Sequence, residues 1–192
     1  MPNIQVIELH MTAFTAVIAE CTELKFRVET ERGAVSAITA AIVDAGETLV
    51  QRGWMTAQKA QGLTFSMEEN ALDLRAALDE VDASIATAIA PVEVFALATE
   101  RLRTARTWDA VSVADERGPP SFALLDTVAA QYSALCEKLL RNVRELASIA
   151  AGQLDDLREK ISLLQSSFGE ITAAMAMPEF YRGAAPSLVT HH

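Results

Sequence analysis

The chain has few of the residue types that most catalytic and metal-binding sites need. Its 192 residues include two cysteines and three histidines. We interpret the terminal pair, His191 and His192, as the remnant of a tag, which leaves His10 as the internal histidine. One imidazole and two thiols cannot complete a histidine–cysteine zinc site, a two-histidine catalytic site or the paired Glu-x-x-His motifs of a di-iron bundle. We therefore expect no metal and no other cofactor, and we place His10 at the surface of a helix or at its boundary with the core.

Glycine, proline and aromatic residues are also scarce. The chain has 8 glycines and 6 prolines, and 6% of its residues are aromatic. This composition excludes a collagen-like or loop-rich protein, and two cysteines exclude a disulfide scaffold. The sequence contains no glycine-rich motif of the kinds that bind nucleotides, and no Gly-x-Ser-x-Gly. We therefore expect a protein that is not an enzyme.

Alanine is the residue in excess, and it indicates helices. The chain has 34 alanines, and 51% of its residues are hydrophobic. Alanine is the best helix former because its side chain loses no entropy in a helix. β-Branched residues recur at helical spacing and do not alternate with polar ones, so we predict an all-α fold. Arginines outnumber lysines by 12 to 4, which together with the alanines is typical of bacterial genomes rich in G and C.

The chain is acidic, with a net charge of -10 and an isoelectric point near 4.8. Nucleic acid is bound by a clustered basic face, so we expect no nucleic-acid partner. The first residues lack the basic and apolar regions of a secretory signal. The apolar stretches 34–43 and 84–98 are shorter than the ~20 residues that span a membrane, so we expect no integral membrane segment. A cytoplasmic location follows, with export by a system that needs no cleavable signal as the alternative.

Residues 4–50 carry a strict seven-residue repeat of apolar side chains. Such a repeat predicts helices that pack against one another as in a coiled coil. Gly33 is able to end a helix, but Val28 and Val35 keep the phase of the repeat across it, so we predict one continuous helix. The members of the repeat are Ile7, Phe14, Cys21, Val28, Val35, Ile42 and Leu49.

The polar stretch 51–64 is expected to connect the first helix to the second. Ser66 and Glu69 have the spacing of a capping box, in which each side chain bonds a free backbone N–H at the start of a helix. We therefore predict that the second helix begins at Ser66. Leu74 and Leu78 begin the apolar stripe that follows.

Pro91 decides between two architectures. Proline lacks an N–H and clashes with the preceding turn, so it kinks or ends a helix. Beyond it we expect a new stripe that faces the core, beginning with Val94 and then Leu97 or Ala98. If Pro91 only kinks the helix, the chain forms an elongated antiparallel bundle of three long rods, which we favour. If Pro91 reverses the chain, four helices of unequal length result.

A loop at 115–120 precedes the last predicted helix, which runs from Ser121 to Met177. Its predicted stripe includes Leu135 and Leu146 and advances in eleven-residue steps at first, before a regular heptad. We expect residues 1–177 to form a single helical-bundle domain and residues 178–192 to form a flexible tail.

Two sets of residues are candidate sites. Large apolar side chains near the first connection and in the tail either cap the ends of the bundle or bind a protein partner. A group of charges interrupts the first stripe. If these charges face the core they need partners or a function, and otherwise they form a solvated or partner-facing patch. The candidate partner-binding residues are Trp54, Met55, Phe65, Met67, Phe180 and Tyr181, and the candidate charge cluster is Lys25, Arg27, Glu29, Glu31 and Arg32.

Residues 135–187 resemble flagellar and type III export chaperones in arrangement, because those proteins also present a long amphipathic C-terminal helix before a short tail with aromatic residues and glycine. The resemblance implies an export chaperone or a component of a surface appendage. Our leading hypothesis is a non-enzymatic helical-bundle protein that binds a protein partner or itself, as an oligomer or a hetero-complex. The alternatives are a self-assembling or granule-coating protein and a small all-α enzyme that uses the charges from Lys25 to Arg32.

Overall fold

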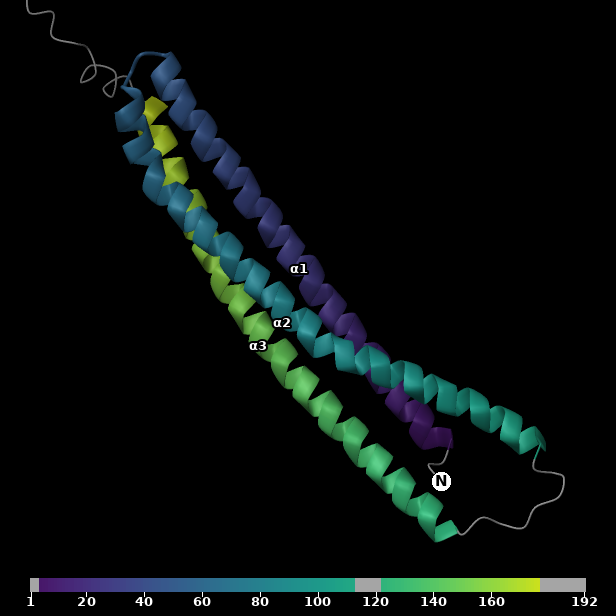
Figure 1. Cartoon of the computed structure of the whole chain (residues 1–192). Helices are drawn as coiled ribbons and strands as arrows, with labels where there is room; N and C mark the ends of the chain where they lie inside the picture. The colour runs from purple at the N-terminus through teal and green to yellow at the C-terminus, as the bar shows by residue number, and fades with distance from the viewer. Residues whose placement is uncertain (1–3, 113–121, 177–192) are drawn as a thin grey trace, which may run out of the picture. The chain divides into compact units, whose positions relative to one another are not determined.

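The computed structural model describes residues 4–112 and 122–176, and these residues form three helices (Figure 1). They are α1 (Ile4–Gln51), α2 (Ala57–Ser112) and α3 (Phe122–Ala176). The described residues contain no strand, so the predicted all-α bundle of three long helices is confirmed. The expected loop at 115–120 and the expected tail, with Phe180 and Tyr181, lie outside the described residues.

Each helix buries one stripe of side chains, at spacings that alternate between three and four residues. This spacing averages 3.5 residues, close to one helical turn, so the stripe stays on one side of the helix. In α1 the seven members of the predicted repeat are each at most 2% exposed. The helix continues through Gly33, as predicted.

α2 is one helix, and its buried stripe keeps its phase across Pro91. Ala88, Val92 and Thr99 on either side of the proline are all buried. The N–H that Pro91 lacks would have bonded the carbonyl of Thr87, a residue on the exposed side of the helix where water can replace that bond. The alternative of four unequal helices is therefore wrong.

The predicted new stripe after Pro91 is also wrong. Val94 is 67% exposed and Leu97 is 56% exposed, so neither side chain faces the core. Their places are taken by Val92 and Thr99, which continue the stripe from before the proline. The prediction failed because it followed the larger apolar side chains instead of the phase.

The stripe of α3 differs from the predicted one for the same reason. Leu135 and Leu146 are 50% and 48% exposed, whereas their neighbours Cys136 and Ala147 are buried. With these two residues the buried stripe is a regular heptad from Cys136 onwards, so the predicted eleven-residue steps are wrong. Small residues in the stripe allow close approach of neighbouring helices, which the size of a side chain alone does not reveal.

The turn between α1 and α2 is shorter than the predicted connection. Gly53 adopts a φ of 68° and ends α1, because this left-handed conformation suits glycine. The N–H of Trp54 bonds the carbonyl of Leu49 at 3.1 Å, and the N–H of Gly53 bonds the carbonyl of Val50 at 3.0 Å. These two bonds are those of a Schellman cap, which satisfies the free carbonyls at a helix end.

Thr56, and not Ser66, caps the start of α2. Its side-chain oxygen accepts a hydrogen bond from the N–H of Lys59 at 3.4 Å, and its carbonyl accepts one from Ala60 at 3.0 Å. Ser66 lies more than two turns inside the helix. The predicted capping box of Ser66 and Glu69 is therefore wrong, because Thr56 follows the turn directly and satisfies the free N–H groups there.

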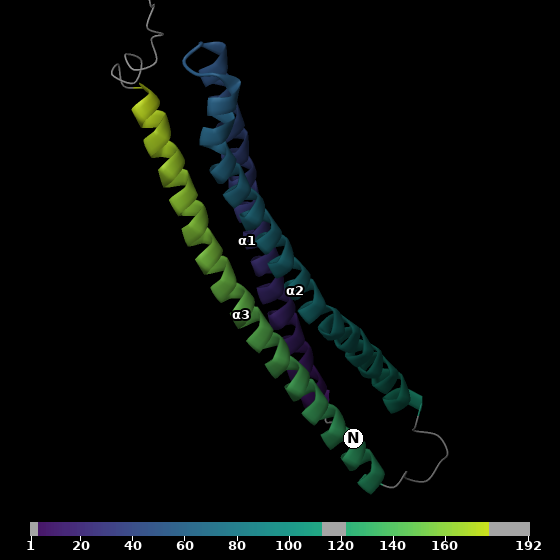
Figure 2. The same ribbon diagram turned by 60° about the vertical axis from the view of Figure 1, so that its left-hand side comes forward.

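The chain divides into two compact units that each contain part of every helix. Unit 1 is Met1–Arg27 with Val81–Gly152, and unit 2 is Val28–Glu80 with Gln153–His192. Within each unit the helix segments lie side by side (Figures 1 and 2). The expectation of a single domain over residues 1–177 stays a prediction.

Candidate functional site

Three of the charges predicted as a cluster form ion pairs within unit 2. Arg32 Nη2 of α1 lies 2.7 Å from Asp79 Oδ1 of α2, and Arg32 also contacts Glu29, one turn earlier on α1. Arg158 Nε of α3 lies 3.7 Å from Glu31 Oε1. The hydrogen bond to Asp79, followed by the bond to Glu29, raises the pKa of Arg32. These pairs link α1 to both of its neighbours.

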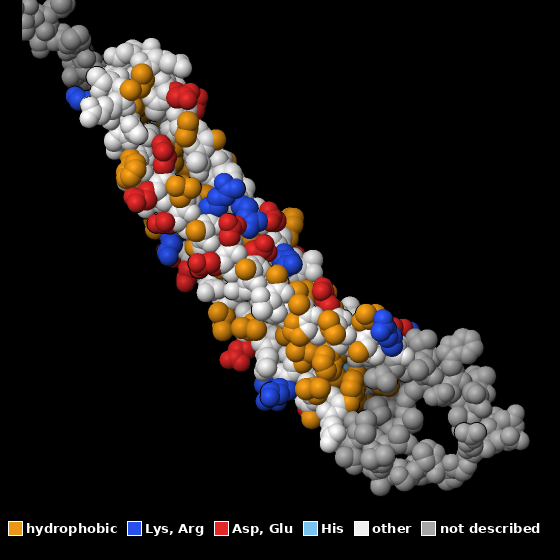
Figure 3. Space-filling view, in the orientation of Figure 1, with side chains coloured by type: hydrophobic (Ala, Val, Ile, Leu, Met, Phe, Trp, Pro, Cys, Tyr) orange, Lys and Arg blue, Asp and Glu red, His pale blue; other side chains and the backbone are white. Residues whose placement is uncertain are grey.

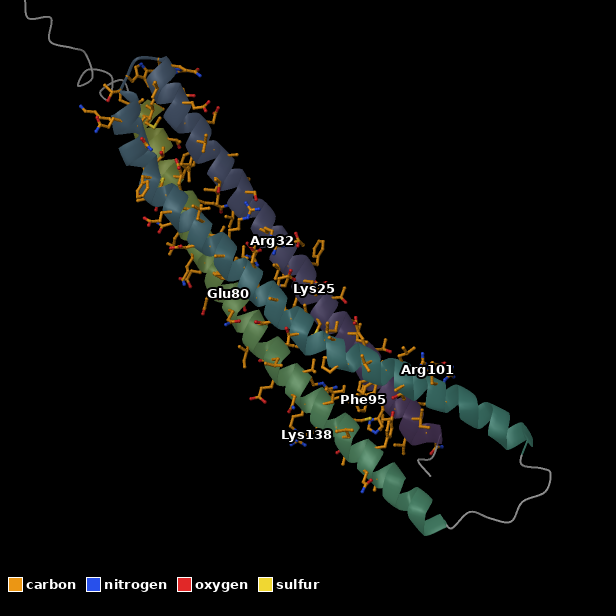
Figure 4. The ribbon with its side chains drawn as sticks, viewed as in Figure 1. Lys25, Arg32, Glu80, Phe95, Arg101 and Lys138 are labelled. Atoms are coloured by element: carbon orange, nitrogen blue, oxygen red, sulfur yellow. The ribbon has the colours of Figure 1, made fainter. Side chains whose placement is uncertain are left out.

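The predicted cluster is divided between the two units. Lys25 and Arg27 belong to unit 1, whereas Glu29, Glu31 and Arg32 belong to unit 2, and Figure 4 labels Lys25 and Arg32 along α1. The side chain of Arg32 is 21% exposed and that of Glu29 is 63% exposed, so this pairing lies at the surface. Ion pairs with such exposed partners contribute little to stability, because water and salt screen them. A catalytic role for the cluster stays a prediction.

The large apolar residues predicted near the first connection do not form one surface. Trp54 and Met55 are half-buried in the turn, and the guanidinium of Arg52 lies 4.9 Å from the centre of the Trp54 ring. Phe65 is 60% exposed, whereas Met67 is half-buried. Because Phe65 and Met67 are two residues apart on α2, they point to opposite sides of the helix.

Met67 lines a groove between α2 and α3 in unit 2, with a volume of about 710 Å³. The walls of this groove are mixed in character. Asp73 on α2 and Lys160 on α3 contribute charges, whereas Leu74 and Leu163 contribute apolar surface. The lining residues therefore show which flank of α2 faces α3, and which flank of α3 faces α2.

Unit 1 contains a polar cluster in its core that the sequence did not predict. His10 of α1 is 5% exposed, and its Nε2 lies 3.0 Å from Ser133 Oγ of α3. The ring of Tyr132 lies edge-on to that of His10, with 5.9 Å between their centres. Thr99 of α2 is fully buried and hydrogen-bonds the hydroxyl of Tyr132. The cluster therefore joins all three helices of unit 1.

The hydrogen bond between Tyr132 and Thr99 has a defined direction. Thr99 Oγ1 donates to the carbonyl of Phe95 at 2.7 Å, so the hydroxyl of Tyr132 is the donor to Thr99. Burial raises the pKa of Tyr132 to about 12, and it also raises the pKa values of the Cys21 and Cys136 thiols. These groups stay protonated near neutral pH. In the described residues no buried side-chain nitrogen or oxygen lacks a hydrogen-bond partner.

The predicted surface or boundary position of His10 is wrong. His10 lies three residues after Ile7 and four before Phe14, and both of those residues are buried in the α1 stripe. The alternating spacing of three and four residues therefore contained the signal for its burial. The prediction missed it because a polar residue was not considered a member of an apolar stripe.

Unit 1 also leaves an apolar surface open, which we call the α2–α3 face. Figure 3 shows apolar side chains gathered over the second half of α2 and the adjoining part of α3. Two rows contribute to it, Pro91, Val94 and Ala98 on α2, and Leu135, Leu139, Leu146 and Ile149 on α3. Residues a whole number of heptads apart lie on the same side of such a helix. Asp73 and Leu163 line the groove of unit 2. Val94 lies three heptads after Asp73 and Ile149 lies two heptads before Leu163, so the two rows continue the rows of that groove along each helix.

The residues of the α2–α3 face are far more exposed than core residues. Val94 is 67% exposed, and Leu135, Leu146 and Ile149 are 50%, 48% and 53% exposed. Phe95 lies beside this face on the α3 side of α2, whereas Lys138 extends from α3 away from α2 (Figure 4). The predicted stripes placed Val94, Leu135 and Leu146 in the core, whereas all three side chains lie on this exposed face.

Two helices also have the length and composition of a membrane-spanning segment. An 18-residue apolar window occurs in α1 within Gln5–Gln51 and another in α2 within Ala57–Arg101, and 28% of each window is buried. The core helix of a soluble protein passes the same test. The absence of an integral membrane segment therefore stays a prediction.

In the part of the chain that the structure describes, no group of three or more His, Cys, Asp or Glu side chains could hold a metal ion. Comparison with known proteins adds no assignment. No protein-family model, no curated protein and no solved structure matches the chain, so the case for a function rests on its own residues.

Proposed function

We propose that this chain is a non-enzymatic interaction protein that receives an amphipathic helix on the α2–α3 face of unit 1. One observation carries the proposal, namely that Val94, Leu135, Leu146 and Ile149 remain about half to two-thirds exposed. Removing apolar surface from water is favourable by ~25 cal/mol per Å². An open apolar face of this kind therefore gains stability when a partner covers it.

The spacing of the face favours a helix as the partner. The rows on α2 and α3 advance by three and four residues, which is the spacing that an amphipathic helix presents to its neighbours. Two such rows accept a third row of the same spacing by ridges-into-grooves packing. An adaptor, an export chaperone or an assembly component is the narrower form of this proposal.

A photo-cross-linking amino acid at position 146, in cells that produce the protein, tests the proposal. We expect a cross-linked product from position 146, because a bound helix would cover that side chain. The matched control is position 9, since Leu9 lies on α1 outside the face and is 67% exposed.

We also expect the product to disappear when Ile149→Glu is added, because a carboxylate in the face opposes apolar docking. Equal cross-linking at positions 146 and 9, or a product that survives Ile149→Glu, would show that the face has no specific partner.

A further inference from the structure

The apolar row on α3 is flanked by two opposite charges. Lys138 and Glu145 are exposed, lie seven residues apart and occupy the same edge of the row, away from the buried stripe. Within the described residues neither side chain forms an ion pair. A lysine and a glutamate one heptad apart, beside an open apolar row, are the elements of a helix that can pair with a copy of itself.

We propose that the helix received by the α2–α3 face is α3 of a second copy of this chain, running antiparallel. This proposal rests on the helix-docking function and names its partner. Leu135 faces Leu146 of the second copy, and Leu139 faces Asn142 of the second copy. In this register Lys138 lies opposite Glu145 of the second copy, and two-fold symmetry repeats the contact, so the interface holds two opposite-charge pairs.

The charges also select this register over its neighbours. A slip of one heptad in one direction places Glu145 opposite Glu145 of the second copy. A slip in the other direction places Lys138 opposite Lys138 of the second copy. Both slips bring like charges together, which is unfavourable, whereas the proposed register brings opposite charges together twice.

A parallel arrangement lacks this advantage. In a parallel pair the position beside Lys138 is that of Val143 of the second copy, which is buried in its own bundle and carries no charge. The antiparallel pair is therefore the arrangement that the row and its charges fit.

The length of the apolar row on α3 determines how stable we expect the dimer to be. From Leu135 to Ile149 the row spans about 21 Å of helix. On α2, Val94 belongs to the same face and Phe95 lies beside it, so both extend the contact beyond α3. Such a contact is short for a coiled coil, so we expect a dimer that dissociates on dilution and not a permanent one.

Charge reversal and molecular mass test the proposal. Light scattering and sedimentation of the purified full chain should show a mass that rises with concentration towards twice 20.7 kDa. Lys138→Glu and Glu145→Lys each replace two attractive contacts with two repulsive ones, so each should weaken the dimer by about tenfold or more. An equimolar mixture of these variants should form a heterodimer, and the double variant with both substitutions should dimerise as the original chain does.

Circular dichroism provides the control for folding, since both substitutions are at exposed positions and should leave the helix content unchanged. Leu97→Glu is the matched control for an exposed residue outside the face, and it should leave the dimer intact. A chain that stays monomeric at every concentration, single variants that dimerise normally, or a double variant that does not recover would each overturn the pairing. A monomer that still cross-links through position 146 to another protein would overturn the pairing alone and leave the helix-docking function in place.

Discussion

Unit 1 and unit 2 are built from segments of the same three helices, yet they distribute polar and apolar side chains differently. The core of unit 1 contains His10 and Thr99, which hydrogen-bond to side chains of α3. The corresponding stripe of unit 2 is almost entirely aliphatic, and its buried polar side chain is Thr64. At the surface the contrast is reversed, because unit 1 has the apolar α2–α3 face and unit 2 has ion pairs between helices.

This contrast indicates that the cores and surfaces of the two units have different roles. An aliphatic core gains stability from packing without defining one register, whereas a hydrogen-bonded polar cluster is satisfied in few alternative arrangements. In unit 1 the cluster is made by residues of all three helices, and Val94 and Leu135 lie outside the core. In unit 2 the same rows contain Asp73 and Lys160, so that groove has less apolar surface to offer a partner.

The largest expected effect tests the core of unit 2. Leu78 is fully buried there, and Leu78→Ala should lower the free energy of unfolding by about 2–5 kcal/mol, because it removes apolar contacts and leaves a cavity. Urea unfolding followed by circular dichroism measures the loss. Leu72 is 65% exposed on the same helix, and Leu72→Ala should change stability by no more than about 0.5 kcal/mol. Equal losses for the two variants would contradict the assignment of the core.

An intermediate effect tests the polar cluster of unit 1. Tyr132→Phe removes the hydroxyl that donates to Thr99, and it should lower the free energy of unfolding by about 1 kcal/mol at neutral pH. The difference between the two proteins should also depend on pH. Burial raises the pKa of Tyr132 from 10.0 to about 12, so the folded chain holds this proton more tightly than the unfolded chain.

The stabilisation from this proton is complete below pH 10 and is lost as the pH rises from 10 towards about 12. The free energies of unfolding of the original chain and of Tyr132→Phe, plotted against pH, should therefore converge over that interval. The comparison cancels the titration of lysines, which both proteins share. Parallel curves from pH 8 to pH 12 would show that the hydroxyl of Tyr132 is not buried in a hydrogen bond.

The regular repeat made part of the fold predictable. Ile7 and Leu49 lie at the two ends of a seven-residue repeat whose phase does not change, so the sequence indicated both the helix and its buried side. The phase was lost where a small or polar residue occupies the stripe, as at Thr99 and Ala147. The prediction therefore assigned their larger neighbours, Leu97 and Leu146, to the core, although these side chains lie on another side of the helix.

The α2–α3 face could not be predicted in the same way. On α3 the row through Leu135 and Leu146 has the same spacing as the buried stripe through Cys136 and Ala147. Which of the two rows faces the core depends on how each helix is rotated against its neighbours, and that rotation is a property of the packed bundle. The hydrogen bond between His10 and Ser133 joins residues 123 positions apart, so local sequence pattern could not reveal it.

The smallest expected effect tests the ion pairs of unit 2. Arg32→Leu removes the contacts to Glu29 and Asp79, yet it should change the free energy of unfolding by less than about 1 kcal/mol, because exposed ion pairs are screened by water and salt. The difference from the original chain should shrink further when unfolding is measured at high salt. Cross-linking through position 146 should be unchanged, since Arg32 belongs to unit 2 and does not contribute to the α2–α3 face. A loss of several kcal/mol would instead make these ion pairs a main source of stability in unit 2, and a loss of that cross-link would make the charges around Arg32 part of the binding site. Either result would remove the contrast between the two units.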